Sequence, residues 1–211
     1  MMRPFLALLA LLASGCASQR ALPVRYDLDG SQVAARTEPR LNATIAIPPI
    51  QAPSWLRTTA LVYRLEYEAP AYPRAYTRSQ WTAPPGELLT LRLRERISSA
   101  NDGFTLAQLP EGSGGYRLEV SLENFAQIFP SPGRSDCVVT LTATIVQRGD
   151  RVLAQKTFRA ERPAPTADAA GGVEGLVDAS DWDFKQILTW VREALPMQQA
   201  AAVRRADRAA P

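Results

Sequence analysis

The chain has 211 residues, of which 46% are hydrophobic and 21% are charged, and its formal net charge is +3. These proportions are typical of a globular protein that can bury a core of its own. So small a net charge gives no reason to expect binding to nucleic acid or a strongly basic membrane-binding face. Histidine is absent, which removes the commonest general base and most zinc sites.

The N-terminus has the pattern of a bacterial export signal. Arg3 is the only charge before the apolar run 5–12, which is typical of a secretory signal and shorter than the about 20 residues of a spanning helix. Residues 13–16, with the sequence ASGC, resemble the lipobox of bacterial lipoproteins. The resemblance implies cleavage between Gly15 and Cys16 and attachment of fatty acyl chains, such as palmitate, to Cys16. Three such chains would anchor the protein almost permanently.

The anchor divides the chain into four segments. We expect a lipoprotein signal peptide at 1–15, a lipidated tether at 16–22, one domain at 23–196 and a flexible C-terminal tail at 197–211. Ala17 directly follows the cysteine. An aspartate at this position commonly signals retention in the inner membrane, so an alanine here favours anchoring in the outer membrane, facing the periplasm. The alternative is a plain secreted protein with a free Cys16.

Strand and helix patterns are mixed along the domain. Alternation of apolar and polar residues predicts strands, and the strongest example is a long three-stranded meander over 116–161 with turns at 130–135 and 149–150. Shorter strands are expected at 24–30, 41–47, 60–67 and 74–79. Spacing of three and four predicts a helix from Pro84-Pro85 to Asp102-Gly103 and another from about Gly172 to Leu195. The fold class is therefore α+β, a mainly antiparallel sheet with two helices packed on one face.

No group of residues has the spacing of a catalytic or metal site. GSGG at 112–115 precedes a strand and is expected to be a turn, and GGVEG at 171–175 is expected to be a hinge or cap more readily than an anion site. The carboxylates of 178–183 lack the spacing of a calcium loop and are expected to cap a helix start. Cys137 begins an apolar run and is expected to be buried and inert. We expect no cofactor, no metal and no enzyme activity.

One cluster of aromatic residues stands out as a candidate partner interface. Tyrosine and tryptophan combine a large contact area with a polar tip and are enriched at interfaces. The alternative is a half-buried sheet face, where aromatic residues are also favoured. The cluster comprises Trp55, Tyr63, Tyr67, Tyr72, Tyr76 and Trp81.

Several stretches together resemble the ABC-type transport auxiliary lipoprotein family. They are WLRTTALVYRLEYEAP, AYTRSQWTAPPGELLTLRLRERI, LEVSLENFAQIFPSP and AQKTFRAERPAPTADAAGGV, followed by the closing helix. The family is the lipoprotein partner of MCE (mammalian cell entry) systems, which move lipids or other hydrophobic molecules between the inner and outer membranes. The resemblance implies a non-catalytic subunit that docks to the MCE protein of an ABC transporter with its permease and ATPase.

Two other functions remain open from the residues themselves. An outer-membrane lipoprotein of this size could regulate a cell-wall enzyme, or it could act as a periplasmic chaperone that holds a lipid. The sequence leaves the cargo, the direction of transport and a homo-oligomer open.

Overall fold

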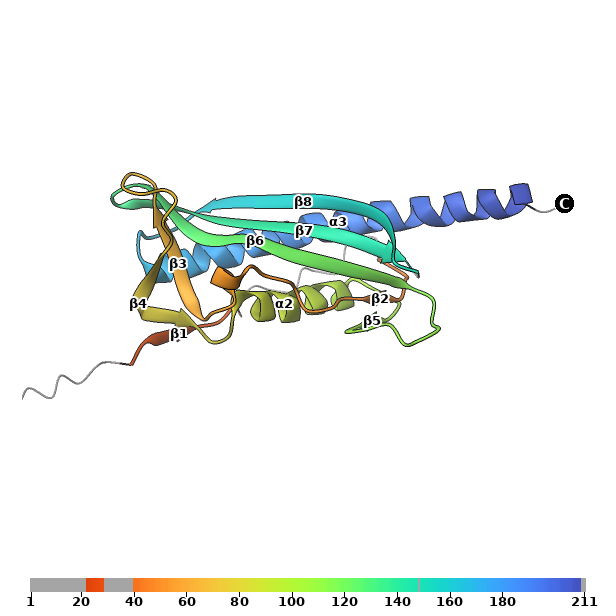
Figure 1. The fold of residues 1–211 in the computed structure, drawn as a ribbon, viewed down its shortest axis with the longest axis horizontal. Coiled ribbons are helices and arrows are strands. Elements are labelled where there is room, and N and C mark those ends of the chain that lie inside the picture. The colour runs from red at the N-terminus through yellow and green to blue at the C-terminus, as the bar shows by residue number, and fades with distance from the viewer. Residues whose placement is uncertain (1–21, 29–39, 148, 210–211) are drawn as a thin grey trace, which may run out of the picture.

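The structure is a computed structural model that describes residues 22–28, 40–147 and 149–209, with residues 196–209 described by their backbone alone. One eight-stranded sheet lies against two helices, α2 (Pro85–Ser99) and α3 (Ala169–Ala209). Figure 1 shows that β1 (Val24–Tyr26) lies at one end of the long axis and that the last turns of α3 project from the other end.

The predicted meander is confirmed. It consists of β6 (Tyr116–Ser131), β7 (Arg134–Gln147) and β8 (Arg151–Pro163), paired antiparallel along nearly their whole length. Val120 lies opposite Ala143 and Leu141 opposite Phe158. The alternating apolar side chains of these strands face the helices, which is the reason that alternation could predict them.

The sheet is mixed, so the expectation of a mainly antiparallel sheet is wrong in this respect. Among the described strands, four pairings are parallel and three are antiparallel. One edge of the long β6 is shared by β3 (Ala60–Leu65) and β2 (Ile45–Ala46), both parallel to it. The parallel partners come from distant parts of the chain, and local alternation carries no information about that pairing.

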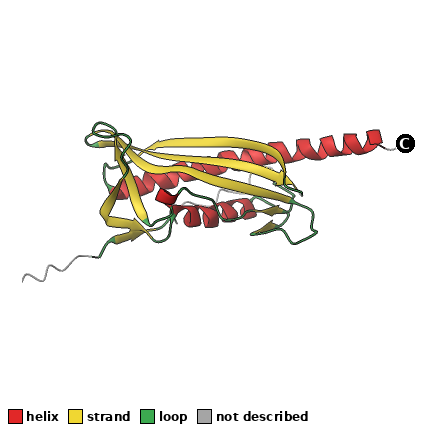
Figure 2. Cartoon of the chain, in the orientation of Figure 1, coloured by secondary structure: helices red, strands yellow, loops and turns green. Residues whose placement is uncertain are grey.

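The remaining elements are short or lie at the edges of the sheet. β4 (Arg74–Trp81) pairs antiparallel with β3 and parallel with β1, while β5 (Thr105–Leu106) pairs with β2. β5 and the 3-10 helix Ser54–Leu56 were not predicted, because segments of two or three residues have no measurable period. Figure 2 shows how the strands form one layer with the helices beside it.

Both helices pack on the same face of the sheet, as predicted. A single core cluster joins the inner face of the meander to Leu89, Leu93 and Ile97 of α2 and to the apolar stripe of α3. Trp81, Phe125 and Phe184 are among its largest fully buried side chains. Within the described residues, no helix is both long enough and apolar enough to cross a bilayer.

α3 begins earlier and ends later than its pattern predicted. Its start is fixed by Asp168, whose carboxylate Oδ1 accepts hydrogen bonds from the Gly171 N–H at 2.9 Å and the Thr166 hydroxyl at 2.8 Å. This is the arrangement by which an aspartate caps a helix. The backbone stays helical to Ala209, across most of the segment expected to be a flexible tail, and the alanines, glutamines and arginines there favour helix.

The carboxylates of 178–183 lie inside α3 and do not cap its start, so that interpretation is wrong. Asp181 pairs with Arg92 and Arg96 of α2 at 2.8 and 2.7 Å, and Asp178 pairs with Arg162 of β8 at 3.2 Å. Residues 178–183 lie at least nine positions after the start of α3 at Ala169. These side chains join α3 to its neighbours.

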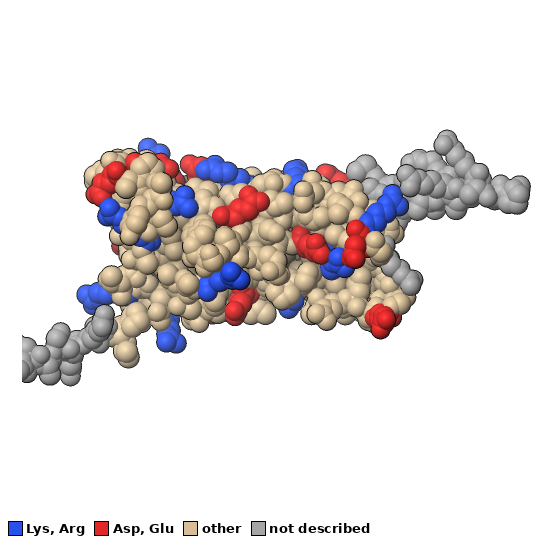
Figure 3. Space-filling view, viewed as in Figure 1, with Lys and Arg blue, Asp and Glu red and all other residues tan. Residues whose placement is uncertain are grey.

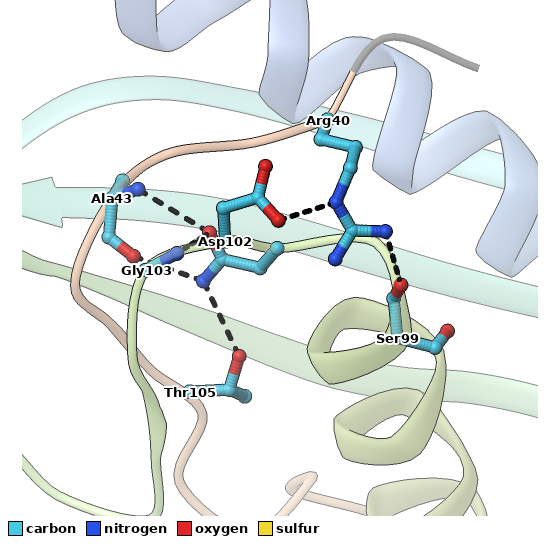
Figure 4. Close-up of polar contacts among 7 residues, drawn as sticks. Arg40, Ala43, Ser99, Asp102, Gly103 and Thr105 are labelled. Carbon is cyan, nitrogen blue, oxygen red and sulfur yellow. Dashed lines mark hydrogen bonds and ion pairs between the residues drawn. The ribbon is translucent and has the colours of Figure 1, made fainter. Parts of the chain in front are cut away.

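A second polar contact fixes the chain where it enters β2. The Asn101 side chain, at the end of α2, donates to the Ala43 carbonyl at 2.9 Å and accepts the Gly103 N–H at 3.1 Å. Arg40 donates to the Asp102 carboxylate and, at 2.9 Å, to the Ser99 carbonyl (Figure 4). The contacts hold residues 40–45 beside β5 and so determine the parallel register of β2.

Candidate docking surface

The six candidate interface residues do not form one exposed surface. Trp81 is 1% exposed and packs on Phe125, with 5.5 Å between ring centroids. Tyr63 and Tyr76 are half-buried and stack on each other at 4.7 Å. Tyr63 and Tyr76 therefore fit the alternative of a half-buried sheet face, and Trp81 belongs to the core.

Tyr67 and Tyr72 are the exposed members, with 44% and 66% of their surface accessible. Both lie in the loop between β3 and β4, which we call the hairpin tip (residues 66–73). The tip is held in place at both ends. Arg74 pairs with Glu68 at 2.6 Å, and the Glu66 N–H donates to the Phe129 carbonyl of β6 at 2.9 Å. Two aromatic rings are therefore presented to solvent on a braced loop.

Beside the tip lies the open face of the sheet, opposite the helices. Val62, Ala126, Ile128 and Val138 form a small apolar cluster on this face, with Trp55 packed against it. The Arg64 guanidinium lies 5.4 Å from the centre of the Trp55 ring, within the range of a cation–π contact. The sixth candidate, Trp55, is thus partly buried and packs against both this cluster and the main core cluster.

A hollow of about 280 Å³ lies in this open face. Charged side chains of both signs line it together with Asn124, Ile128 and Val138; the charged residues are Arg64, Glu66, Arg134, Asp136, Arg159 and Glu161. Arg64 Nε and Asn124 Oδ1 are buried and have no hydrogen-bond partner among the described residues. The hollow reaches Glu66, so it is continuous with the hairpin tip. One unused donor and one unused acceptor therefore lie beside exposed aromatic rings.

A buried polar cluster joins the start of α3 to the sheet. Gln127 of β6 is fully buried, and its side-chain N–H₂ donates to the Ser135 hydroxyl at 2.8 Å and to the Asp168 carbonyl at 3.1 Å. Its side-chain carbonyl accepts the Tyr76 hydroxyl at 2.9 Å. These contacts satisfy the Gln127 amide, as buried polar groups require. The cluster is a structural joint between β4, β6 and α3.

The GGVEG segment is a site of close packing and not a hinge or a cap. A Cβ atom on Gly172 would lie 2.2 Å from the Gln127 side-chain oxygen, and one on Gly175 would lie 2.6 Å from the Cys137 sulfur. Only glycine lets α3 approach the sheet this closely. The Cys137 thiol, 3.2 Å from the Gly172 carbonyl, is fully enclosed.

The Cys137 thiol and the Tyr76 hydroxyl stay protonated at neutral pH. Desolvation, with a smaller contribution from Asp136, raises the pKa of the Cys137 thiol to about 12. Burial, followed by the effect of Tyr63, raises the pKa of Tyr76. The nucleophilic form of a cysteine is the thiolate, so Cys137 is inert, as the apolar run predicted.

Asp183 is a buried carboxyl group that the pattern did not single out. Asp183 is 1% exposed and lies on the face of α3 toward β8. Burial raises its pKa from 3.8 to about 7, although the hydrogen bond from the Ala160 N–H and the charge of Arg162 both lower it. Its Oδ2 has no partner in the described structure. The available signal was its place on the apolar stripe, four residues before Ile187 and seven after Leu176.

In the part of the chain that the structure describes, no group of three or more potential ligand side chains could hold a metal ion. The lipidation residue Cys16 and the cleavage position Gly15 lie outside the described residues.

The fold defines a small α+β domain built on a long meander, with its helices on one face and an aromatic tip at one end. Residues 26–187 match the family described as the ABC-type transport auxiliary lipoprotein component, and the chain belongs to that family. This confirms the resemblance and its lipoprotein character at the level of the family.

Solved structures show the same fold. A Xanthomonas campestris protein described as a member of family DUF330 is 16% identical, with a TM-score of 0.71 over 85% of this chain and 99% of its own. An uncharacterized protein is also 16% identical, with a TM-score of 0.61 over 81% of this chain and 99% of its own. Among curated proteins, none matches the sequence significantly.

Proposed function

We propose that the chain is a non-catalytic subunit of an MCE-type ABC system that transports lipids or other hydrophobic molecules between the two membranes. In this proposal, acylated Cys16 anchors it to the outer membrane, facing the periplasm, and the domain docks to the MCE protein. The permease and the ATPase complete the system. The single observation that carries the proposal is the family match over residues 26–187.

The chemistry of the described groups favours binding over catalysis. The Cys137 thiol is held protonated and enclosed, and the Gln127 amide is fully engaged in structural hydrogen bonds. The hollow in the open face is lined by six charged side chains and is smaller than the roughly 300–1,000 Å³ of typical small-molecule pockets. Such a polar surface suits contact with another protein better than storage of a lipid chain.

The docking surface we propose consists of Trp55, Arg64, Tyr67, Tyr72 and Asn124. Aromatic residues and arginine are enriched at the centres of protein interfaces, where they contribute most of the binding free energy. Arg64 and Asn124 both line the hollow in the open face, so they place polar side chains beside these rings. Acidic and basic side chains lie interspersed over most of the face seen in Figure 3, so recognition here would depend on matched contacts more than on net charge.

Purification of the acylated protein from native membranes tests the proposal. After mild cross-linking, the tagged wild type should bring down an MCE protein with its permease and ATPase, identified by mass spectrometry. The control is Cys16→Ala, which should recover much less because it is not anchored beside its partners. Recovery of a cell-wall enzyme in place of all three transporter components would contradict the proposal and support the regulatory alternative.

A further inference from the structure

The strand nearest the expected anchor has an unusual exposed composition. β1 is at the edge of the sheet and pairs, among the described strands, with β4 alone. Leu22 is 91% exposed and Val24 is 54% exposed, although both are large aliphatic residues. Arg25 follows directly and is also exposed. Two exposed aliphatic side chains and an exposed arginine thus lie where the described chain begins.

Two further arginines lie at the same end of the molecule. Arg78 is in β4, one residue before Ser79, which pairs with Val24. Arg57 is two residues before Thr59, whose carbonyl accepts a hydrogen bond of 2.8 Å from the Trp81 N–H. Trp81 in turn pairs with Tyr26 of β1. Both are exposed. Figure 3 shows basic side chains at this end, near the start of the described chain.

The three arginines have no acidic partner within the described structure. The ion pairs found there involve other arginines, among them Arg74, Arg92 and Arg162. In the meander, Arg117, Arg134 and Arg159 are paired with acidic side chains, whereas the exposed Arg151 and Lys156 of β8 have no ion pair within the described residues. Three exposed arginines without an ion pair thus lie at the β1 end, although the net charge of the whole chain is only +3.

The length of the tether places this end close to the bilayer. Five residues separate Cys16 from Leu22, so a fully extended tether spans at most about 20 Å. The other end of the meander, where β7 turns into β8, lies a whole strand of 14 residues away, or about 46 Å. An anchor on Cys16 therefore keeps the β1 end, and not the far turn, beside the lipid headgroups.

We propose that Leu22, Val24, Arg25, Arg57 and Arg78 form a membrane-contact patch that binds anionic lipid headgroups of the membrane holding the anchor. This rests on the anchoring part of the proposed function. Arginines near an anionic surface each strengthen binding by roughly fivefold, and exposed leucine and valine can enter the interfacial layer. The contact orients the domain so that the projecting end of α3 points away from the membrane.

Vesicle sedimentation of the chain from Ala17 to Pro211 tests the patch without the acyl anchor. All residues of the main core cluster lie between Leu28 and Leu195, so this chain contains the complete described core. We expect it to sediment with vesicles of phosphatidylethanolamine and phosphatidylglycerol and much less with vesicles of phosphatidylcholine. Arg25→Gln/Arg78→Gln should weaken partitioning into the anionic vesicles by about 25-fold, from roughly fivefold for each charge.

The matched control is Arg151→Gln/Lys156→Gln, which removes the same charge from exposed positions of β8. It should retain wild-type partitioning, and the thermal melts of all three proteins should agree. Equal loss in both double variants, unchanged binding by Arg25→Gln/Arg78→Gln, or no preference of the wild type for anionic vesicles would each overturn the patch. Because the chain carries no acyl group, these results are independent of whether Cys16 is acylated or an MCE protein is bound.

Discussion

Asp183 should make the folding stability depend on pH in a way that one substitution can remove. Its pKa is raised to about 7 in the folded protein, mainly by burial, against about 3.9 in an unfolded chain. The folded state therefore holds a proton between about pH 4 and pH 7 that the unfolded state releases. The stabilisation from this proton is complete below pH 4 and is lost as the pH rises through 7.

The size of this effect follows from the two pKa values. A tenfold change in proton affinity corresponds to about 1.4 kcal/mol, so the upper bound is about 4 kcal/mol. The Ala160 N–H and Arg162 of β8 favour the ionised form, and their effect is already part of the raised pKa. We expect Asp183→Asn, which cannot ionise, to be more stable than the wild type at pH 8 by about 2–4 kcal/mol. Most of this advantage should be lost by pH 5 and the rest below pH 4.

Urea unfolding of the chain from Ala17 to Pro211, followed by tryptophan fluorescence at several pH values from 5 to 8, measures this difference. Other groups titrate equally in both proteins and cancel in the comparison. The control is Asp178→Asn, since the Asp178 side chain is 67% exposed in its pair with Arg162, and its difference from wild type should stay within about 1 kcal/mol at each pH. Parallel pH profiles for Asp183→Asn and wild type would refute the reasoning, because Asp183 would then be ionised in the folded protein.

Three other substitutions test the packing of α3, the anchor and its destination. Gly175→Ala should lower the free energy of unfolding by about 1–3 kcal/mol, because its Cβ would meet the Cys137 sulfur at 2.6 Å. Adding Cys137→Ala to the same chain should restore most of the loss. An unchanged free energy of unfolding in Gly175→Ala would contradict the close packing. Cys16→Ala should abolish acylation and leave an uncut or soluble periplasmic form, and a variant that stays in the detergent phase without palmitate labelling would refute the anchor. Ala17→Asp should move the protein to inner-membrane fractions, a prediction that fails if the wild type is already found there.

Strong local periodicity made the long elements predictable. The meander follows from strict alternation and α2 from Leu89, Leu93 and Ile97, because each pattern records one buried face. The pairing of β2 and β3 with β6 depends on contacts between distant segments, which no local pattern encodes. The glycines at 171 and 172 obscured the start of α3, since glycine disfavours helix. Gly172 is required by the Gln127 side chain of β6, and Gly171 by the close approach of Thr166.

The candidate surface, too, could be predicted from the sequence only in part. Tyr63 and Tyr67 are four residues apart, yet one stacks inside the sheet and the other projects from a loop. Composition could identify the aromatic cluster, but only the position of the β3–β4 turn separates exposed rings from buried ones. Likewise, Asp178 and Asp183 belong to one acidic run and both lie near β8, but Asp183 is buried while Asp178 remains largely exposed in its pair with Arg162.

The affinity of the mature protein for the periplasmic part of its MCE partner tests the central claim most directly. In the Tyr67→Ala/Tyr72→Ala variant, each lost ring should weaken binding by roughly thirtyfold if it lies at the interface centre, from about 2 kcal/mol per anchor. The thermal melt should stay within a few degrees, because both rings are largely exposed. The control is Phe104→Ala, which removes an aromatic ring that is 70% exposed outside the proposed surface.

The account predicts a large rise in Kd for Tyr67→Ala/Tyr72→Ala and an unchanged Kd for Phe104→Ala. An unchanged Kd in the tyrosine variant, or no measurable binding of the wild type to the MCE partner, would contradict it.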